Sequence, residues 1–328
     1  MIRRRKVVLS IGLLSLGGYR SARAQAAPAL RRVGMLAIGS AASSAAVMAA
    51  LQQGLAEFGW VDGQNLALRV VYAHGDFARL EPLAGELVAQ SVELVACSTP
   101  QAVATLHRAA PLLPIVMLGV GNPVQLGFVA SLARPGGVIT GLSMQSEDLR
   151  AKPIQFLHEM LPAARRIGVL QSAASAVTTS AWVDTERACL ALGLTPLRVQ
   201  ASEPAQLGAA VQQLVKLKVH AVVVPADGMM FNERARLHAL LQAARLPVAY
   251  SAREHAQAGG LFSFGTNLAA NFRYAAKYVD KILRGAKPAD LPVEQPTIFE
   301  FVINLTAAKA LGIQVPKALL LRADELIQ

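Results

Sequence analysis

Polar residues follow several of the apolar runs in this sequence, and their types are suited to binding a small charged molecule. Most carry hydroxyl or amide groups, which donate hydrogen bonds to an anion, and one carries a carboxylate, which attracts an ammonium group or accepts a hydrogen bond from a hydroxyl. A zwitterion would satisfy both kinds of group. The predicted ligand-binding residues are Ser40, Ser43, Ser98, Thr99, Gln101, Gly121, Asn122, Pro123, Ser172, Asp227, Met229 and Ser251.

The stretch 118–143 contains one half of this predicted site. An apolar strand over 114–118 leads through glycines and Asn122 into a predicted helix whose first position is Pro123. Proline suits that position because the N–H it lacks would have no partner within the helix. The remaining unpaired N–H groups of a helix start can hold an anion. The turn that follows, 133–137, is predicted to lie beside a hinge.

Helix capping is an alternative explanation for the same residues. Ser98, Thr99 and Asn122 are predicted at helix starts, where such side chains commonly accept a hydrogen bond from the backbone. Asp227 precedes Gly228 and could cap a helix in the same way. The sequence leaves open whether Asp227 contacts a ligand or caps a helix.

The motifs of common enzymes and cofactor sites are incomplete in this chain. Gly119 and Gly121 begin a dinucleotide-binding pattern, but position 124 is Val where a third glycine is needed. Ser263 is one residue away from the spacing of a nucleophile elbow. The six histidines form no metal-binding pair at helical spacing. We therefore expect no catalytic residue, no metal and no cofactor.

The segments that must position the predicted site alternate between short apolar strands and amphipathic helices from Arg31 onward. This order is typical of parallel sheets built from βα units, in which ligands bind at the carboxyl ends of the strands. The series then restarts. Residues 31–36 resemble 165–170, 93–96 resemble 220–223, and 113–116 resemble 246–249, in the same order and at nearly constant spacing. The repetition predicts two similar α/β lobes.

Residues 1–24 are predicted to be a cleaved secretory signal peptide. Arg3 to Lys6 form a basic region, Val7 to Leu16 an apolar region, and Ala22 to Ala24 a small-residue cleavage site. No cysteine precedes Cys97, so we expect no lipid anchor and a soluble protein in the periplasm. Cys97 and Cys189 fall in different lobes and are predicted to be buried free thiols.

The charge of the chain does not favour nucleic acid as a partner. The full sequence has a net charge of +11, from 32 basic and 21 acidic side chains. Loss of the six basic residues within 1–24 would leave 26 basic and 21 acidic side chains, a net charge of +5. These are dispersed along the chain and form no basic helix or stripe.

Several motifs resemble the family of ABC transporter substrate-binding proteins. The motifs are LQQGLAEFGW at 51–60 with DGQN at 62–65, VASLARPGG at 129–137, ILRGAKP at 282–288, VINL at 302–305 with AKALG at 308–312, and RADE at 322–325. This chain differs from the family pattern at Gly228, Met229 and Met230, which follow Asp227, and at Phe264, where many members carry Tyr. Some members bind aromatic amino acids.

The resemblance implies a type I periplasmic binding protein fold. The fold is two doubly wound parallel-sheet lobes joined by about three hinge crossovers, near residues 145, 266 and 292. Lobe I is expected over 31–145 and 267–291, and lobe II over 146–266 and 292–328. The strand and helix predicted over 261–283 and the strand over 299–305 fit neither lobe as a simple tandem, which supports several crossovers between lobes.

The function predicted from these features is capture of a small organic solute in the cleft between the lobes, with amino acids and related compounds as the candidate solutes. The protein would act as a monomer, deliver the solute to the permease of an ABC importer, and perform no covalent chemistry. A ligand-sensing subunit for a periplasmic receptor shares every feature above and remains an alternative. A secreted α/β enzyme is a second alternative, although it lacks a recognisable catalytic constellation.

Overall fold

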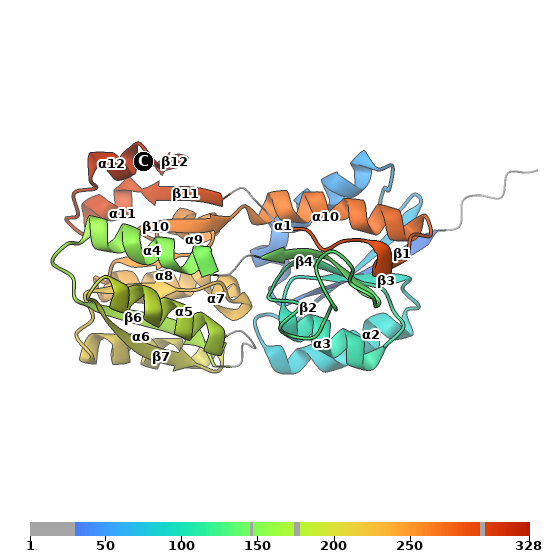
Figure 1. Cartoon of the computed structure of the whole chain (residues 1–328), viewed down its shortest axis with the longest axis horizontal. Coiled ribbons are helices and arrows are strands. Elements are labelled where there is room, and N and C mark those ends of the chain that lie inside the picture. Colours follow the sequence, from blue (N-terminus) through green and yellow to red (C-terminus); the bar gives the residue numbers. More distant parts are fainter. Residues whose placement is uncertain (1–29, 145–146, 174–177, 296–298) are drawn as a thin grey trace, which may run out of the picture.

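The computed structural model describes residues 30–144, 147–173, 178–295 and 299–328. The predicted signal peptide lies outside these residues. Within them the chain forms two α/β lobes side by side, each a sheet with helices on both faces (Figure 1). The predicted fold class is confirmed.

The first lobe contains a five-stranded sheet in which all neighbours run parallel. Its strands are short and mostly buried on both faces, as expected for a sheet covered by helices. Their order is β2 (Leu66–Tyr72), β1 (Arg31–Ala37), β3 (Leu94–Cys97), β4 (Ile115–Gly121) and β5 (Ile139–Met144). Its helices are α1 (Ala41–Glu57), α2 (Leu80–Ala89), α3 (Pro100–Ala109) and α10 (Leu268–Leu283), with a 3₁₀ turn η1 (Phe77–Arg79).

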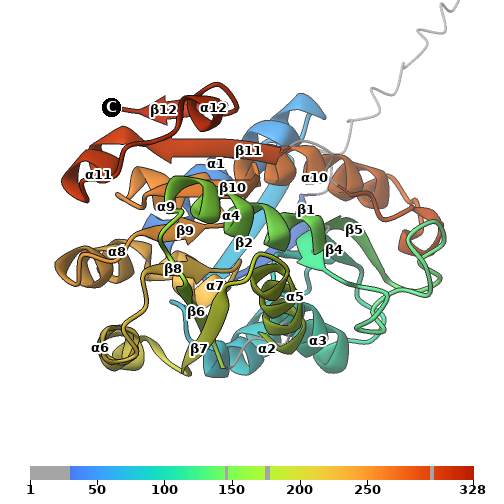
Figure 2. The ribbon, with the colours of Figure 1, turned by 60° about the vertical axis from the view of Figure 1, so that its left-hand side comes forward.

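The second lobe repeats this order and extends it. Its seven strands are ordered β12 (Glu325–Ile327), β11 (Phe299–Asn304), β10 (Phe262–Thr266), β9 (Val248–Tyr250), β8 (Ala221–Val224), β6 (Arg166–Ser172) and β7 (Thr195–Ala201). The run β7-β6-β8-β9-β10 matches β2-β1-β3-β4-β5, which is the arrangement that the internal repetition predicts. The pair β10–β11 is antiparallel, so this sheet is mixed (Figure 2).

Eight helices and one 3₁₀ turn accompany the second sheet in the described chain. They are α4 (Glu147–Met160), α5 (Thr178–Ala191), η2 (Pro204–Gln206), α6 (Leu207–Lys216), α7 (Gly228–Asn232), α8 (Arg234–Ala243), α9 (Arg253–Gln257), α11 (Leu305–Ala310) and α12 (Lys317–Leu320). A further 3₁₀ turn, η3 (Pro288–Asp290), follows α10 and packs against β5 of the first sheet. Ile154, Phe262 and Phe301 belong to the core on one face of the sheet, and Leu214 and Tyr250 to the core on the other.

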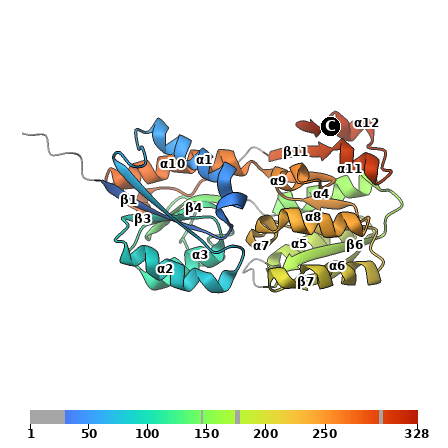
Figure 3. The same ribbon diagram turned by 180° about the vertical axis from the view of Figure 1, so that it is seen from behind.

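Helix α10 packs on the first sheet although its sequence follows β10 of the second (Figures 1 and 3). Phe272, Ala276 and Val279 recur at helical spacing and share a core with Met35 and Leu51. Gly54 of α1 permits this packing, because a Cβ there would lie 2.3 Å from the carbonyl oxygen of Arg273. The chain's late return to the first lobe therefore closes that lobe's core.

Successive elements change from one lobe to the other at three places: between β5 and α4, between β10 and α10, and between Glu294 and β11. Hydrogen bonds connect these crossings. The Ser143 N–H donates to the carbonyl oxygen of Glu294 at 2.8 Å, and Asn267 Nδ2 donates to Glu300 Oε1 at 2.7 Å. Asn267 also caps α10, since its Oδ1 accepts from the Ala270 N–H at 2.8 Å. Residues beside one crossing are thus hydrogen-bonded to residues beside another.

The predicted helix beginning at Pro123 is wrong. Residues 123–127 form turns, and the left-handed backbone at Asn122 (φ 50°) and Gly127 (φ 72°) interrupts any helix there. This segment folds back so that Val129 enters the core of the first lobe. The free thiols are confirmed: Cys97 closes β3, Cys189 lies in α5, and both are buried.

Candidate functional site

A cavity of about 200 Å³ lies between the lobes, among the carboxyl ends of strands from both sheets. Met35 and Leu118 line it from the first sheet, and Val224 and Tyr250 line it from the second. A cavity of this size fits one small organic molecule.

The first lobe contributes a polar wall at the start of α3. Ser98, Thr99 and Gln101 all line the cavity, and Gly121 lies beside them at the end of β4. Thr99 is the N-cap, because its side chain accepts from the Ala102 N–H at 3.3 Å. A capped start of a ten-residue helix still presents a partial positive charge, which favours a carboxylate.

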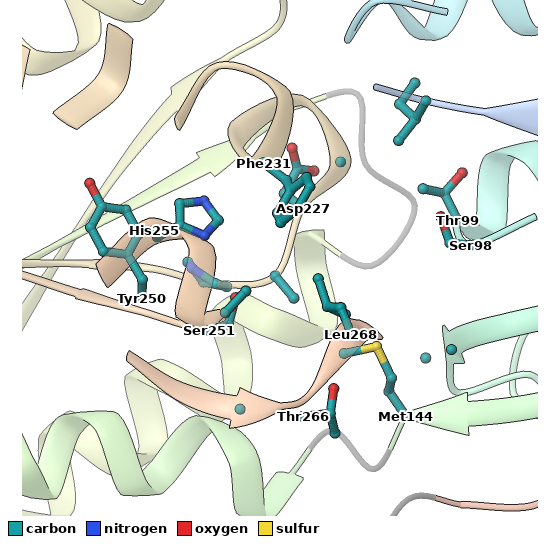
Figure 4. Close-up of a pocket in the computed structure, with 18 of the residues that line it drawn as sticks. Ser98, Thr99, Met144, Asp227, Phe231, Tyr250, Ser251, His255, Thr266 and Leu268 are labelled. Carbon is teal, nitrogen blue, oxygen red and sulfur yellow. The ribbon is translucent and has the colours of Figure 1, made fainter. Parts of the chain in front are cut away.

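The second lobe contributes Asp227 and Ser251 to the cavity. Asp227 Oδ1 accepts from the Met230 N–H at 3.0 Å and so caps α7. Figure 4 shows Asp227 across the cleft from Ser98 and Thr99. The capping role that the sequence raised is confirmed, and the same carboxylate lines the cavity.

Three aromatic side chains of the second lobe, Phe231, Tyr250 and His255, line the cavity and contact one another. His255 stacks on Tyr250 with ring centroids 4.6 Å apart and meets the edge of Phe231 at 5.6 Å. Burial, with a smaller contribution from the positive charge of Arg234, lowers the pKa of His255 to about 3. Burial likewise raises the pKa of the Tyr250 hydroxyl. Both rings are therefore neutral near pH 7.

The remaining lining is mostly apolar and comes from both lobes. Figure 4 shows Met144 and Leu268 between the two polar walls. Further apolar side chains that line the cavity are Ile38, Val47, Phe77, Phe264 and Phe272. A ligand with a polar head and a large apolar group would match this lining.

Arg150 is the one arginine among the lining residues. It forms an ion pair with Asp184 of α5, and both side chains are mostly buried, at 13% and 14% exposed. Asp184 therefore compensates the charge that Arg150 brings to the cavity.

Six of the twelve predicted ligand-binding residues line the cavity and six lie elsewhere. Those that line it are Ser98, Thr99, Gln101, Gly121, Asp227 and Ser251. Ser40 and Ser43 contact Asn232 of α7, and Asn122 and Pro123 belong to the turn after β4. Ser172 and Met229 are buried within the second lobe. The rule that ligands bind at the carboxyl ends of parallel strands, here called the strand-end rule, selects loops. It does not say which side chains of a loop point into the cavity.

The sequence analysis did not identify Arg150, Phe231 and His255 as lining residues, nor the apolar side chains that line the cavity, such as Met144 and Leu268. Most of these lie on helices or at crossovers, where the strand-end rule gives no signal. Phe231 could have been predicted from the sequence, because it follows Asp227 by one helical turn and so lies on the same side of α7.

Two absences hold for the part of the chain that the structure describes. No group of three or more His, Cys, Asp or Glu side chains is arranged to hold a metal ion. No helix there combines the length and the apolar character needed to cross a membrane.

Comparison with known proteins relates the chain to binding proteins. A family model described as ABC transporter substrate binding protein matches residues 32–327. A tyrosine-binding protein from Clostridioides difficile (strain R20291) is 27% identical over 263 residues, which cover 79% of this chain and 74% of that protein.

Two solved structures are similar over nearly the whole chain. An ABC domain from Streptococcus pneumoniae in complex with L-Trp is 26% identical with a TM-score of 0.84, covering 91% of this chain and 100% of its own. A conserved domain protein from Vibrio cholerae O1 biovar El Tor is also 26% identical with a TM-score of 0.84, covering 90% of this chain and 99% of its own.

Proposed function

The chain belongs to the ABC transporter substrate-binding protein family, and we propose that it captures an L-amino acid with a large apolar side chain between its two lobes. The observation that carries this proposal is the opposition of two walls across one cavity. Ser98 and Thr99 at the start of α3 suit a carboxylate, and Asp227 on the other lobe suits an ammonium group.

The apolar lining supports a large side chain. Phe231, Phe264 and Phe272 line the same cavity as the polar walls, and aromatic rings favour planar or bulky apolar groups. The relatives point the same way, since one is a tyrosine-binding protein and another is solved with L-Trp. We propose aromatic L-amino acids as the first ligands to test.

Members of this family bind a small molecule and a membrane permease. For this chain we propose a periplasmic monomer that is exported by the signal peptide over 1–24 and passes its ligand unchanged to the permease. The basic, apolar and small-residue regions of 1–24 support export. Binding without turnover predicts that mass spectrometry recovers the added amino acid intact after prolonged incubation with the protein.

A thermal-shift screen tests the ligand class. The set contains the twenty L-amino acids, dipeptides, purines and simple carboxylates, each added to the protein without residues 1–24. Binding to the folded state raises Tm in proportion to the logarithm of ligand concentration over Kd. We expect stabilisation by L-tyrosine or L-tryptophan. Stabilisation by purines or carboxylates alone would contradict the amino-acid proposal, and stabilisation by no compound would contradict solute binding.

A further inference from the structure

The two lobes contact each other outside the lining of the cavity through a hydrogen-bonded group. Asn232, the last residue of α7, reaches from the second lobe to the start of α1 in the first. Its Oδ1 accepts from the Ser40 N–H at 3.0 Å and from Ser43 Oγ at 2.9 Å. Figure 3 shows α7 on the side of the second lobe that faces the first. The described lining of the cavity includes Phe231 but not Asn232.

We infer that Asn232 is an affinity-determining residue, which holds the cleft closed around the ligand without contacting the ligand. This inference rests on the proposed function for its consequence, because closure matters only if a ligand binds inside. Its structural basis is the contact between the lobes. We call the group Ser40, Ser43 and Asn232 the latch.

The latch is built so that it can open at little cost. Ser40 and Ser43 also form a capping box within the first lobe: Ser40 Oγ accepts from the Ser43 N–H at 3.1 Å, and Ser43 Oγ accepts from the Ser40 N–H at 2.8 Å. The start of α1 thus keeps its cap when the lobes separate. Asn232 is oriented by its own lobe, since its Nδ2 donates to Glu233 Oε1 at 2.8 Å.

Two glycines permit the close approach of the lobes. A Cβ at Gly75 of the first lobe would lie 3.0 Å from Asn232 Nδ2. A Cβ at Gly228 of the second lobe would lie 2.6 Å from Ile38 Cγ2 of the first. Larger residues at either position would push the lobes apart. Gly228, which follows Asp227, therefore affects how closely the two lobes can approach each other.

A mutant series measures what the latch contributes to binding. Titrations with L-tyrosine and L-tryptophan compare the wild type with Asn232→Ala, Ser43→Ala and the double variant. Loss of neutral hydrogen bonds of this kind weakens binding by about three- to tenfold. We expect the change mainly in the dissociation rate, because the open form that meets the ligand is unaltered. Gln242→Ala, an exposed amide on the neighbouring helix α8, is the matched control and should leave affinity unchanged.

The double variant separates the latch from a general loss of stability. Ser43→Ala also weakens the cap of α1 and lowers Tm without ligand, whereas Asn232→Ala should leave that Tm unchanged. If the two side chains act together, the loss of binding free energy in the double variant should be smaller than the sum of the two single losses. The difference is the coupling energy between the two side chains. Additive losses in affinity, or no loss in Asn232→Ala, would overturn the inference.

A second measurement does not depend on any ligand. In an Ile38→Cys/Gly228→Cys background, a Cβ at position 228 lies 3.3 Å from the Cβ of residue 38, close to the roughly 3.5–4.5 Å typical of disulfides. Native Cys97 and Cys189 are buried and should not compete. Oxidation should form the cross-lobe disulfide about three- to tenfold more slowly when Asn232→Ala is added.

The outcomes distinguish the two proposals. Equal oxidation rates with and without Asn232, or no cross-lobe disulfide at all, would overturn the latch. Slower oxidation in Asn232→Ala, together with no binding of either amino acid by the wild type, would support the latch and reject the proposed ligand class. If an amino acid binds with the same affinity to the wild type and to every latch variant, the proposed ligand class is supported and the latch is rejected.

Discussion

Asp227 has a structural role that the hydrogen bonds show and a binding role that we propose. Its Oδ1 caps α7, and the side chain lines the cavity opposite Ser98 and Thr99. A search for polar residues at strand ends finds such a side chain but cannot separate the two roles. The separation has to come from a substitution that preserves one role and removes the other.

Asp227→Asn is that substitution. Asparagine caps helices about as well as aspartate, so the free energy of unfolding should change by less than about 0.5 kcal/mol. Loss of a charge-assisted hydrogen bond to an ammonium group costs about 1.5–3 kcal/mol, so affinity for L-tyrosine or L-tryptophan should fall about tenfold or more. Calorimetric titration and urea unfolding measure the two effects. Unchanged affinity would leave Asp227 as a cap alone.

His255 gives a prediction about pH and stability. Its pKa is lowered to about 3 in the folded protein, whereas an unfolded histidine titrates near 6.5. As the pH falls, the unfolded chain therefore binds a proton at this histidine before the folded protein does. The stability of the folded protein is unaffected by protonation of His255 above about pH 6.5 and decreases as the pH falls from about 6.5 toward 3. The free energy of unfolding should fall by up to about 1.4 kcal/mol per pH unit in that window from this residue.

His255→Phe tests this by removing the titrating group while keeping a ring beside Tyr250. Urea unfolding from pH 4 to 7 should show a shallower loss of stability in the variant than in the wild type. Parallel curves for the two proteins would show that His255 is not the group that becomes protonated on unfolding.

At the scale of elements, the parts of the fold that were predictable are those with local signals. Buried four-residue strands such as β3 and β8, and the one-sided apolar pattern of α10, are visible in the sequence because hydrophobic periodicity is a local property. The helix predicted to begin at Pro123 is wrong: the chain has left-handed backbone at Asn122 and Gly127, and Val129 packs into the core of the first lobe. That packing involves distant segments and gives no local signal in the sequence.

The candidate site was predictable only in part, because local sequence patterns find residues at strand ends but not residues that are placed by the packing of distant segments. The loops after β3 and β8 supplied Ser98, Thr99 and Asp227 by the strand-end rule. Phe272 reaches the cavity because α10 returns to the first lobe, and Met144 reaches it because it ends β5 at a crossover. Neither position follows from local sequence, since both depend on how distant segments pack.

The contact between α1 and α10 yields a stability prediction. Gly54→Ala places a methyl group 2.3 Å from the Arg273 carbonyl oxygen and should destabilise the protein by about 1–3 kcal/mol. Gly85→Ala in α2 is the matched control, because a Cβ there meets no atom within 4 Å, and it should be neutral or stabilising by up to about 1 kcal/mol. Similar effects of the two substitutions would contradict tight α1–α10 packing.

At the scale of the whole molecule, our proposals assign binding and closure to separate parts of the two lobes. The polar walls and aromatic rings line the cavity, the latch joins the two lobes, and the hydrogen bonds of Asn267 and Glu294 lie beside the chain crossings between the lobes. A binding protein needs its ligand to favour the closed form, and this separation lets affinity be tuned by residues that never meet the ligand.

The most direct test of the account is isothermal titration calorimetry with matched analogues of one amino acid. The protein without residues 1–24 is titrated with L-tyrosine, with tyramine, which lacks the carboxylate, and with 3-(4-hydroxyphenyl)propionate, which lacks the ammonium group. The series is repeated with L-tryptophan and its analogues. We predict that the intact amino acid binds at least about tenfold more tightly than either analogue, because each analogue leaves one polar wall unpaired. Equal binding of an amino acid and its two analogues would contradict a zwitterion held between the lobes.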